Sequence, residues 1–217
     1  MSYTLVYFNA RGRGEVIRLI FAAAKVAYTD KRFPIDFANF AKAEFDVEKA
    51  KGSFDYNMGS VPVLIHEGPD GKKFELGQSK TIERYLAKKF DLLGSNDEEA
   101  ALVDMITEHI RDIKLKYNDT KVGKKGDELT AAKNAFVNES LPTWFGKLEK
   151  ALSGNGFAVG DRLSYADIAI FDIVHDYFDD KEGAFAATAN TPKIRNSASI
   201  ARSAVQDWLN VRPDTKV

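Results

Sequence analysis

Residues 3–24, YTLVYFNARGRGEVIRLIFAAA, decide the fold of the first part of the chain. Residues 3–8 are rich in aromatic and β-branched side chains, which predicts a strand. Residues 9–13 are polar and contain Gly12, which predicts a loop. From Gly14 onward, apolar residues recur with the spacing of one helical face. A strand, a short loop and a helix in this order indicate an α/β domain.

Further strand and helix signals continue up to residue 90. Residues 28–35 give a weak strand signal. Residues 61–65 predict a third strand, opened by Pro62, because proline is confined to strand starts and edges. A turn then leads to a short fourth strand at residues 74–76. Ser79 is expected to cap the next helix. Residues 1–90 are therefore predicted to form a small α/β domain.

The rest of the chain has a helical pattern. Apolar residues keep a helical period over residues 102–117, and residues 129–152 form another helical stretch, broken near Pro142. Residues 164–167, SYAD, have the pattern of a capping box that opens a further helix. Residues 91–217 are therefore predicted to form an all-helical second domain.

The composition limits the classes of function. The chain has 217 residues, 31 Lys plus Arg against 32 Asp plus Glu, and no cysteine. A net charge of −1 gives no electrostatic reason to expect nucleic acid or an anionic membrane as a partner. Without cysteine, any sulfur chemistry must come from a ligand. Neither a transmembrane span nor a signal peptide is evident, so the cytosol is the expected location.

Three groups of polar residues are candidates for a site, and each is a weak signal alone. Tyr7 ends the first strand, where the edge of an α/β sheet presents functional groups, although a core tyrosine would look the same. Arg13 adds a cation near the start of a helix. Gln78 and Ser79 offer donors suited to a carboxylate at another helix start. The three histidines are isolated, so no metal site or catalytic triad is expected.

Three motifs nevertheless occur in the order typical of one family: YFNARGRGEVIRLIFA (residues 7–22), SVPVL (60–64) and GQS (77–79). They resemble the opening, the cis-proline strand and the γ-glutamyl site of sigma-class glutathione transferases, most closely of the glutathione-dependent prostaglandin D synthase branch. Residues 160–167 and 208–213 are similar to the folding motif and the C-terminus of the same family. The resemblance therefore covers essentially the whole chain.

This resemblance implies a thioredoxin-like first domain, an all-helical second domain, and a homodimer that uses glutathione as cosubstrate and requires no metal. It implies that the Tyr7 hydroxyl activates the glutathione thiol and that Arg13 tunes it. Phe8 and Arg13 are expected to line the pocket for a hydrophobic substrate. The residues expected to bind glutathione are Tyr7, Arg13, Phe45, Lys49, Ser60, Val61, Pro62, Gln78, Ser79 and Asp112 of the partner subunit.

Some positions depart from the pattern of this family. Phe45 stands where the family has tryptophan, and phenylalanine cannot donate an indole hydrogen bond. The spacing from Phe45 assigns Lys49 to the glycyl carboxylate of glutathione, but Lys42 and Lys51 remain alternatives because this stretch carries inserted residues. Arg111 stands where the prostaglandin synthases have an acid of their metal-binding cluster. This change puts prostaglandin isomerisation in doubt and leaves glutathione chemistry intact.

The expected function is conjugation of glutathione to small hydrophobic electrophiles, with hydroperoxide reduction as a side activity. Lowering a thiol pKa by about two units requires about 2.7 kcal/mol of thiolate stabilisation, most of which one charge-assisted hydrogen bond from Tyr7 can supply. Two alternatives stay open: a glutathione-dependent prostaglandin isomerase, and a crystallin-like or ligand-carrying relative without activity. The joint presence of Tyr7, Arg13, Gln78 and Ser79 favours the transferase.

Overall fold

The computed structural model describes residues 2–215, which form two compact units. Within this range the first unit contains residues 2–90 and 207–215, and the second contains residues 91–206. Residues 207–215, which the sequence assigns to the helical domain, therefore group with the α/β part of the chain.

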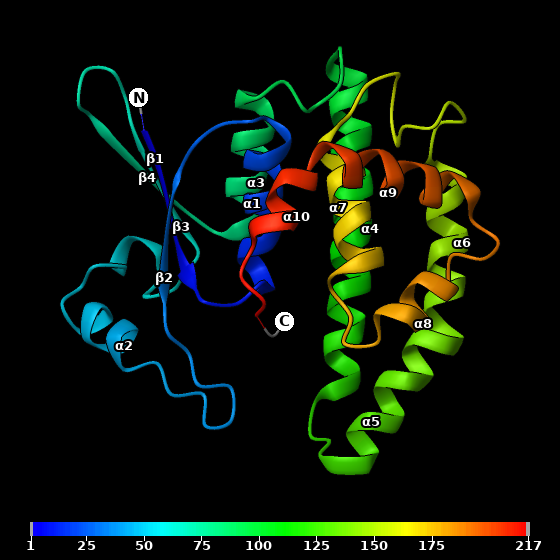
Figure 1. Cartoon of the computed structure of the whole chain (residues 1–217), viewed down its shortest axis with the longest axis horizontal. Helices are drawn as coiled ribbons and strands as arrows, with labels where there is room; N and C mark the ends of the chain where they lie inside the picture. Colours follow the sequence, from blue (N-terminus) through cyan, green and yellow to red (C-terminus); the bar gives the residue numbers. More distant parts are fainter. Residues whose placement is uncertain (1, 216–217) are drawn as a thin grey trace. The chain divides into compact units, whose positions relative to one another are not determined.

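The first unit is built on a four-stranded mixed sheet with the strand order β2-β1-β3-β4 (Figure 1). Its strands are β1 (Ser2–Phe8), β2 (Thr29–Phe33), β3 (Val63–Glu67) and β4 (Lys73–Gly77). β1 pairs parallel with β2 and antiparallel with β3, in a register that aligns Leu5 with Leu64. β4 pairs antiparallel with β3, which places Gly77 opposite Val63. This confirms the thioredoxin-like α/β fold expected for this part of the chain.

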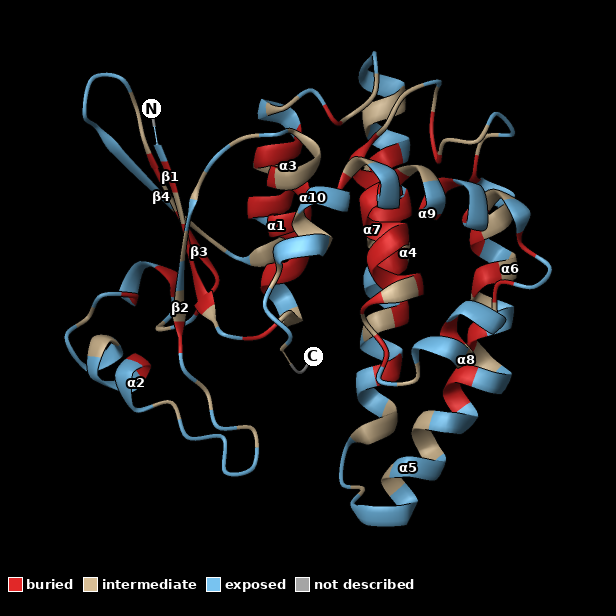
Figure 2. Cartoon of the chain, viewed as in Figure 1, coloured by how far each residue is buried: buried red, intermediate tan, exposed pale blue. Residues whose placement is uncertain are grey.

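Helices cover both sides of this sheet. α1 (Glu15–Ala23) and α3 (Ser79–Lys89) pack against each other on one side, and α2 (Ala43–Ala50) lies on the other (Figure 1). Figure 2 shows that the buried residues of the unit gather on α1, on α3 and on the strands between the helices. The side chains of Ile17, Leu19, Ile20 and Leu86 are completely buried there.

Three local features differ from the sequence-based predictions. α2 was not predicted, because it buries only Phe45 and so has almost no apolar periodicity. The 3₁₀ turn η1 (Gly12–Gly14) overlaps the predicted loop of residues 9–13, and a second, η2 (Asp55–Asn57), lies in a stretch for which no element was predicted. The predicted cap at Ser79 is wrong: Gln78 occupies the N-cap position, and Ser79 is the first helical residue of α3.

The second unit, residues 91–206, contains helices joined by loops, and none of its described residues forms a strand. Its helices are α4 (Asp97–Lys121), α5 (Gly126–Ala135), α6 (Leu141–Ala151), α7 (Tyr165–His175), α8 (Lys181–Ala186) and α9 (Pro192–Ala204). α7 forms the centre, since its first ten residues are all buried and it packs against α4, α8 and α9 (Figure 2). A short π-helical segment, η3 (Phe136–Ser140), joins α5 to α6. It lies just before Pro142, where the sequence predicts a break.

The predicted capping box at the start of α7 is present. Ser164 and Asp167 exchange hydrogen bonds between their side chains and backbone amides. The buried Asp167 carboxylate also accepts hydrogen bonds from the Ala158 backbone amide and the Ser197 hydroxyl, each at 2.7 Å. Asp167 therefore ties the preceding loop and α9 to the start of α7.

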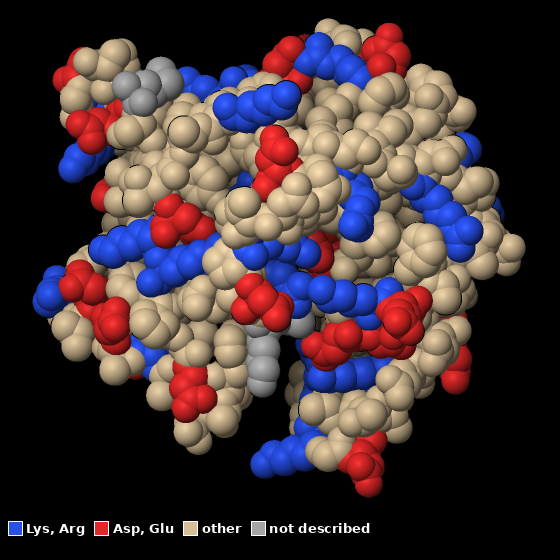
Figure 3. Space-filling view, in the orientation of Figure 1, with Lys and Arg blue, Asp and Glu red and all other residues tan. Residues whose placement is uncertain are grey.

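Two further properties follow from the structure, one of its surface and one of its helices. Figure 3 shows Lys and Arg side chains interspersed with Asp and Glu side chains, so the face in view has no continuous patch of one sign. Within residues 2–215, none of the helices combines the length and the apolar character needed to cross a bilayer.

Candidate functional site

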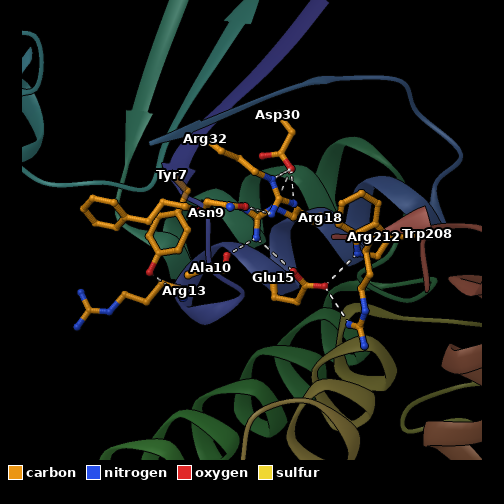
Figure 4. Close-up of polar contacts among 11 residues, drawn as sticks. Tyr7, Asn9, Ala10, Arg13, Glu15, Arg18, Asp30, Arg32, Trp208 and Arg212 are labelled. Atoms are coloured by element: carbon orange, nitrogen blue, oxygen red, sulfur yellow. Dashed lines mark hydrogen bonds and ion pairs between the residues drawn. The ribbon is translucent and has the colours of Figure 1, made fainter. Parts of the chain in front are cut away.

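Tyr7 lies near the end of β1, and its hydroxyl faces the loop that leads to α1 (Figure 4). The backbone N–H of Arg13 donates to the Tyr7 hydroxyl oxygen over 3.1 Å. A hydroxyl can accept and donate at the same time, and no acceptor within residues 2–215 takes the Tyr7 proton. The Tyr7 hydroxyl is therefore fixed through its oxygen and free to donate its proton to a ligand.

Two glycines of the loop leave room for the Tyr7 ring. A Cβ atom at Gly12 would lie 2.8 Å from the Tyr7 hydroxyl oxygen, and one at Gly14 would lie 2.6 Å from the ring carbon Cδ1. Gly12 also has a φ of 38°, in the left-handed region that favours glycine. Close packing around the tyrosine therefore explains both glycines. The Arg13 side chain between them is exposed and leaves the loop beside the Tyr7 hydroxyl (Figure 4).

A buried ionic network holds the same loop from inside the unit (Figure 4). The fully buried Arg18 guanidinium donates to the Ala10 carbonyl oxygen at 2.7 Å. It also pairs with the carboxylates of Glu15 at 3.2 Å and Asp30 at 3.0 Å. Its carbon Cζ lies 5.9 Å from the centre of the Tyr7 ring, within the range of a cation–π contact. One side chain thus connects the loop after β1, α1 and β2.

The network extends to α10 (Gln206–Val211) and the residue that follows it. The Trp208 indole N–H donates to Glu15 Oε1 at 3.0 Å, and an Arg212 guanidinium N–H donates to the same oxygen at 3.2 Å. Sequence reasoning missed this network. The available signal was the position of Arg18 between apolar residues of α1. A charge that is buried among such residues must have a partner.

Gln78 joins β4 to α3 in an unusual backbone conformation. Its φ of 66° and ψ of 112° lie outside the regions that residues other than glycine normally adopt. Such strain persists only where the surroundings impose it, and it is concentrated at functional sites. Because Ser79 begins α3, its amide and hydroxyl lie at a helix N-terminus, which favours a bound carboxylate.

Val61 precedes β3 and is joined to Pro62 by a cis peptide bond. The pairing of β3 with its neighbours begins at Val63. Within the described range, the amide and the carbonyl of Val61 have no backbone partner. The main chain of Val61 can therefore pair with a peptide ligand in the manner of an added strand. Ser60, just before it, is exposed.

Of the three candidate lysines, Lys49 is distinguished by its surroundings. Lys42 pairs with Asp46 at 3.2 Å, and Lys51 pairs with Glu48 at 2.7 Å. Lys49 has no ion-pair partner among residues 2–215, and its side chain lies over Gly59, where its Nζ would be 3.3 Å from an added Cβ. The ammonium group of Lys49 is therefore free for a ligand beside the loop that carries Ser60 and Val61.

The remaining candidates fall into two groups. Phe45 is buried in one apolar cluster with Tyr7 and Val61, and Phe8 packs against that cluster. The aromatic residue at position 45 therefore supports the site by packing. Asp112 lies on α4 in the second unit with an exposed side chain, so it is not among the residues that the first unit brings together. In the part of the chain that the structure describes, no His, Cys, Asp or Glu cluster is arranged to hold a metal ion.

Comparisons with known proteins show similarity to one family in both parts of the chain. Residues 3–88 match the family model described as the glutathione S-transferase N-terminal domain, and residues 111–210 match that of the C-terminal domain. The chain is 38% identical to a glutathione S-transferase of Plasmodium yoelii yoelii over 81% of each sequence.

Solved structures superpose on the whole chain. Na-GST-3, described as a monomeric glutathione S-transferase from the hookworm Necator americanus, has a TM-score of 0.78 at 31% identity and covers 100% of both chains. A Nu-class enzyme from Haemonchus contortus has a TM-score of 0.77 at 30% identity and covers 100% of this chain and 99% of that one.

Proposed function

Because the chain belongs to the glutathione S-transferase family, we propose that it conjugates glutathione to small hydrophobic electrophiles after ionising the glutathione thiol with the Tyr7 hydroxyl. The observation that carries this proposal is the bond from the Arg13 amide to the Tyr7 oxygen, which fixes the hydroxyl and leaves its proton available. We assign the chain to a sigma-like class of this family on the basis of the motif at residues 7–22. We also expect hydroperoxide reduction as a side activity.

The energy available from Tyr7 fits the task. A free thiol has a pKa of about 8.5, so about 1% of it is ionised at pH 6.5. A charge-assisted hydrogen bond contributes about 1.5–3 kcal/mol, which lowers the pKa by one to two units. Tyr7 donates to the thiolate and stays protonated, and the exposed Arg13 guanidinium beside it adds a cation. The thiol proton passes to solvent water. The thiolate then attacks an electrophilic carbon held against Phe8 and Arg13, and the C–S bond forms as the leaving group departs with its electron pair.

Glutathione would be held along its length by the other candidates. Lys49 binds the glycyl carboxylate, the Val61 main chain pairs with the cysteinyl residue, and Gln78 and Ser79 bind the γ-glutamyl end. The strain at Gln78 and the free ammonium group of Lys49 support these roles. Asp112 of the partner subunit would complete the γ-glutamyl site in a homodimer.

Two observations on α4 bear on the assembly and on the reaction. Leu102 and Met105 are 43% and 49% exposed, which suits a contact with a second copy of the chain. Arg111, where the prostaglandin synthases are expected to have an acid, pairs with Glu108 at 2.8 Å. The transferase is therefore preferred over a prostaglandin isomerase.

The proposal is tested by an ultraviolet titration of glutathione bound to the purified protein, following thiolate absorbance against pH. We expect an apparent thiol pKa near 6.5, about two units below the free value. If glutathione binds with an unshifted pKa, the chain is a carrier of glutathione and does not activate it. If glutathione does not bind at all, the proposed function is wrong.

Lys49→Ala is expected to raise the KM for glutathione about tenfold and to leave kcat at saturating glutathione within about threefold. The reason is that a lysine–carboxylate hydrogen bond contributes about 1.5–3 kcal/mol to binding and is the same in the ground and transition states. Steady-state kinetics with varied glutathione measure both constants. Lys51→Ala is the matched control, since Lys51 already pairs with Glu48. If Lys51→Ala raises the KM for glutathione more than Lys49→Ala does, Lys51 and not Lys49 binds the glycyl carboxylate.

A further inference from the structure

Asn57, the last residue of η2, is only 4% exposed although its side chain is a polar amide. A buried amide must find hydrogen-bond partners, and both acceptors of the Asn57 side-chain NH₂ group lie in the cis-proline loop. Its Nδ2 donates to the Ser60 carbonyl oxygen at 2.8 Å and to the Pro62 carbonyl oxygen at 3.3 Å. These two carbonyls flank Val61, whose main chain is the candidate partner of the cysteinyl residue.

The other side of the same amide contacts the second candidate segment. An added Cβ at Gly77 would lie 1.9 Å from Asn57 Oδ1 and 2.1 Å from Cγ, so the amide occupies the space over the Gly77 backbone. Gly77 lies opposite Val63 in the sheet and directly precedes the strained Gln78. Asn57 is thus wedged between the loop of residues 60–62 and the segment of residues 77–79.

We propose that Asn57 is a positioning residue for glutathione, which sets the spacing between the Val61 main chain and the Gln78–Ser79 segment. This inference rests on the proposed function, because it assumes that one ligand contacts both segments. The cysteinyl and γ-glutamyl residues are adjacent in one ligand, so both bind well only when the two segments keep a distance that a bound conformation of the ligand can span. Asn57 acts through backbone groups, and it does not touch the Tyr7 hydroxyl that ionises the thiol.

The test compares glutathione binding by calorimetry, steady-state kinetics and the bound-thiol titration for wild type, Asn57→Ala and Asn57→Asp. Alanine removes the amide altogether. Aspartate keeps the shape of the asparagine side chain. It replaces the Nδ2 donor with an oxygen that can only accept and that faces two carbonyl oxygens. For both variants we expect the Kd for glutathione to rise about tenfold, kcat at saturating glutathione to stay within about threefold, and the bound-thiol pKa to stay unchanged.

Gly77→Ala perturbs the same contact from the other side and should reproduce this pattern, which keeps the test decisive if one Asn57 variant does not fold. Asn155→Ala is the matched control, because Asn155 Nδ2 likewise donates to a loop carbonyl, that of Gly160, but in the second unit. The Kd of the Asn155→Ala variant for glutathione should equal that of wild type.

The failures of the two proposals are distinguishable. If wild type does not bind glutathione, the proposed function fails. If wild type binds and the folded Asn57 variants bind within twofold of it, with only the melting temperature lowered, Asn57 is merely structural and this inference is wrong. A bound-thiol pKa that returns to the free value in the Asn57 variants would also overturn it, because the residue would then act through Tyr7.

Discussion

Replacing Tyr7 with phenylalanine is expected to reduce the thiolate fraction of bound glutathione about 50-fold at pH 6.5. With the hydroxyl, a bound thiol of pKa about 6.5 is half ionised, and without it a thiol of pKa about 8.5 is about 1% ionised. The Kd for glutathione should change by less than about threefold, because the carboxylate-binding residues remain. The bound-thiol titration and calorimetry measure the two quantities.

The effect on kcat is expected to depend on pH in a way that identifies its cause. A more basic thiolate is more nucleophilic, with a Brønsted coefficient of about 0.4–0.5, which recovers about 6–10-fold of the loss. We therefore expect kcat to fall only about 5–8-fold at pH 6.5 and the difference to reverse by about pH 9, where both thiols are largely ionised and the more basic thiolate of the variant reacts faster.

Tyr28→Phe is the matched control for this experiment. The Tyr28 hydroxyl is buried in the same unit and has no hydrogen-bond partner within residues 2–215, so its removal should leave both the titration and kcat unchanged. A Tyr7→Phe variant that loses the same factor at pH 6.5 and pH 9.5 would contradict thiol ionisation as the role of Tyr7.

Replacing Arg18 with methionine is expected to lower the free energy of unfolding by about 3 kcal/mol. Removing one partner of a buried ion pair costs about 3–5 kcal/mol, because the other charge is left uncompensated. The lower end applies here, since Glu15 keeps Arg212 and Asp30 keeps Arg32. The Ala10 carbonyl, however, loses its charged donor. Urea unfolding measured by circular dichroism gives this quantity.

Arg32→Met is the control for Arg18, because both guanidinium groups contact the same oxygen of Asp30. The Arg32 side chain is 15% exposed and the Arg18 side chain is not exposed at all. Water can therefore replace Arg32 in part, and we expect a loss of at most about 1 kcal/mol. Equal losses from the two variants would show that burial of the Arg18 charge is not what stabilises the unit.

Local patterns predicted the elements that depend on neighbouring residues. The strand, loop and helix of residues 3–24 and the capping box at Ser164 can be read from the sequence, because period and capping chemistry are local. α2 could not be predicted, since only Phe45 of that helix is buried and its amphipathic signal is correspondingly weak.

The parts of the site that the sequence left open depend on contacts between distant residues. Lys49 is preferred as a candidate because its side chain lies over Gly59, a contact that depends on the fold of the whole segment between them. The burial of Asn57 depends on the register that brings Gly77 opposite Val63. Neither this contact nor the register can be predicted from the local pattern, so only the folded chain reveals them.

The return of residues 207–215 to the α/β part of the chain has a consequence for synthesis on the ribosome. The first 90 residues emerge early, but the Glu15 carboxylate then lacks Trp208 and Arg212, which are made only after the whole helical unit. Domains usually fold in the order in which they are made. Here the first unit to emerge is completed last, so the Arg18 network and the Tyr7 loop beside it reach their final form only once residue 212 has been added.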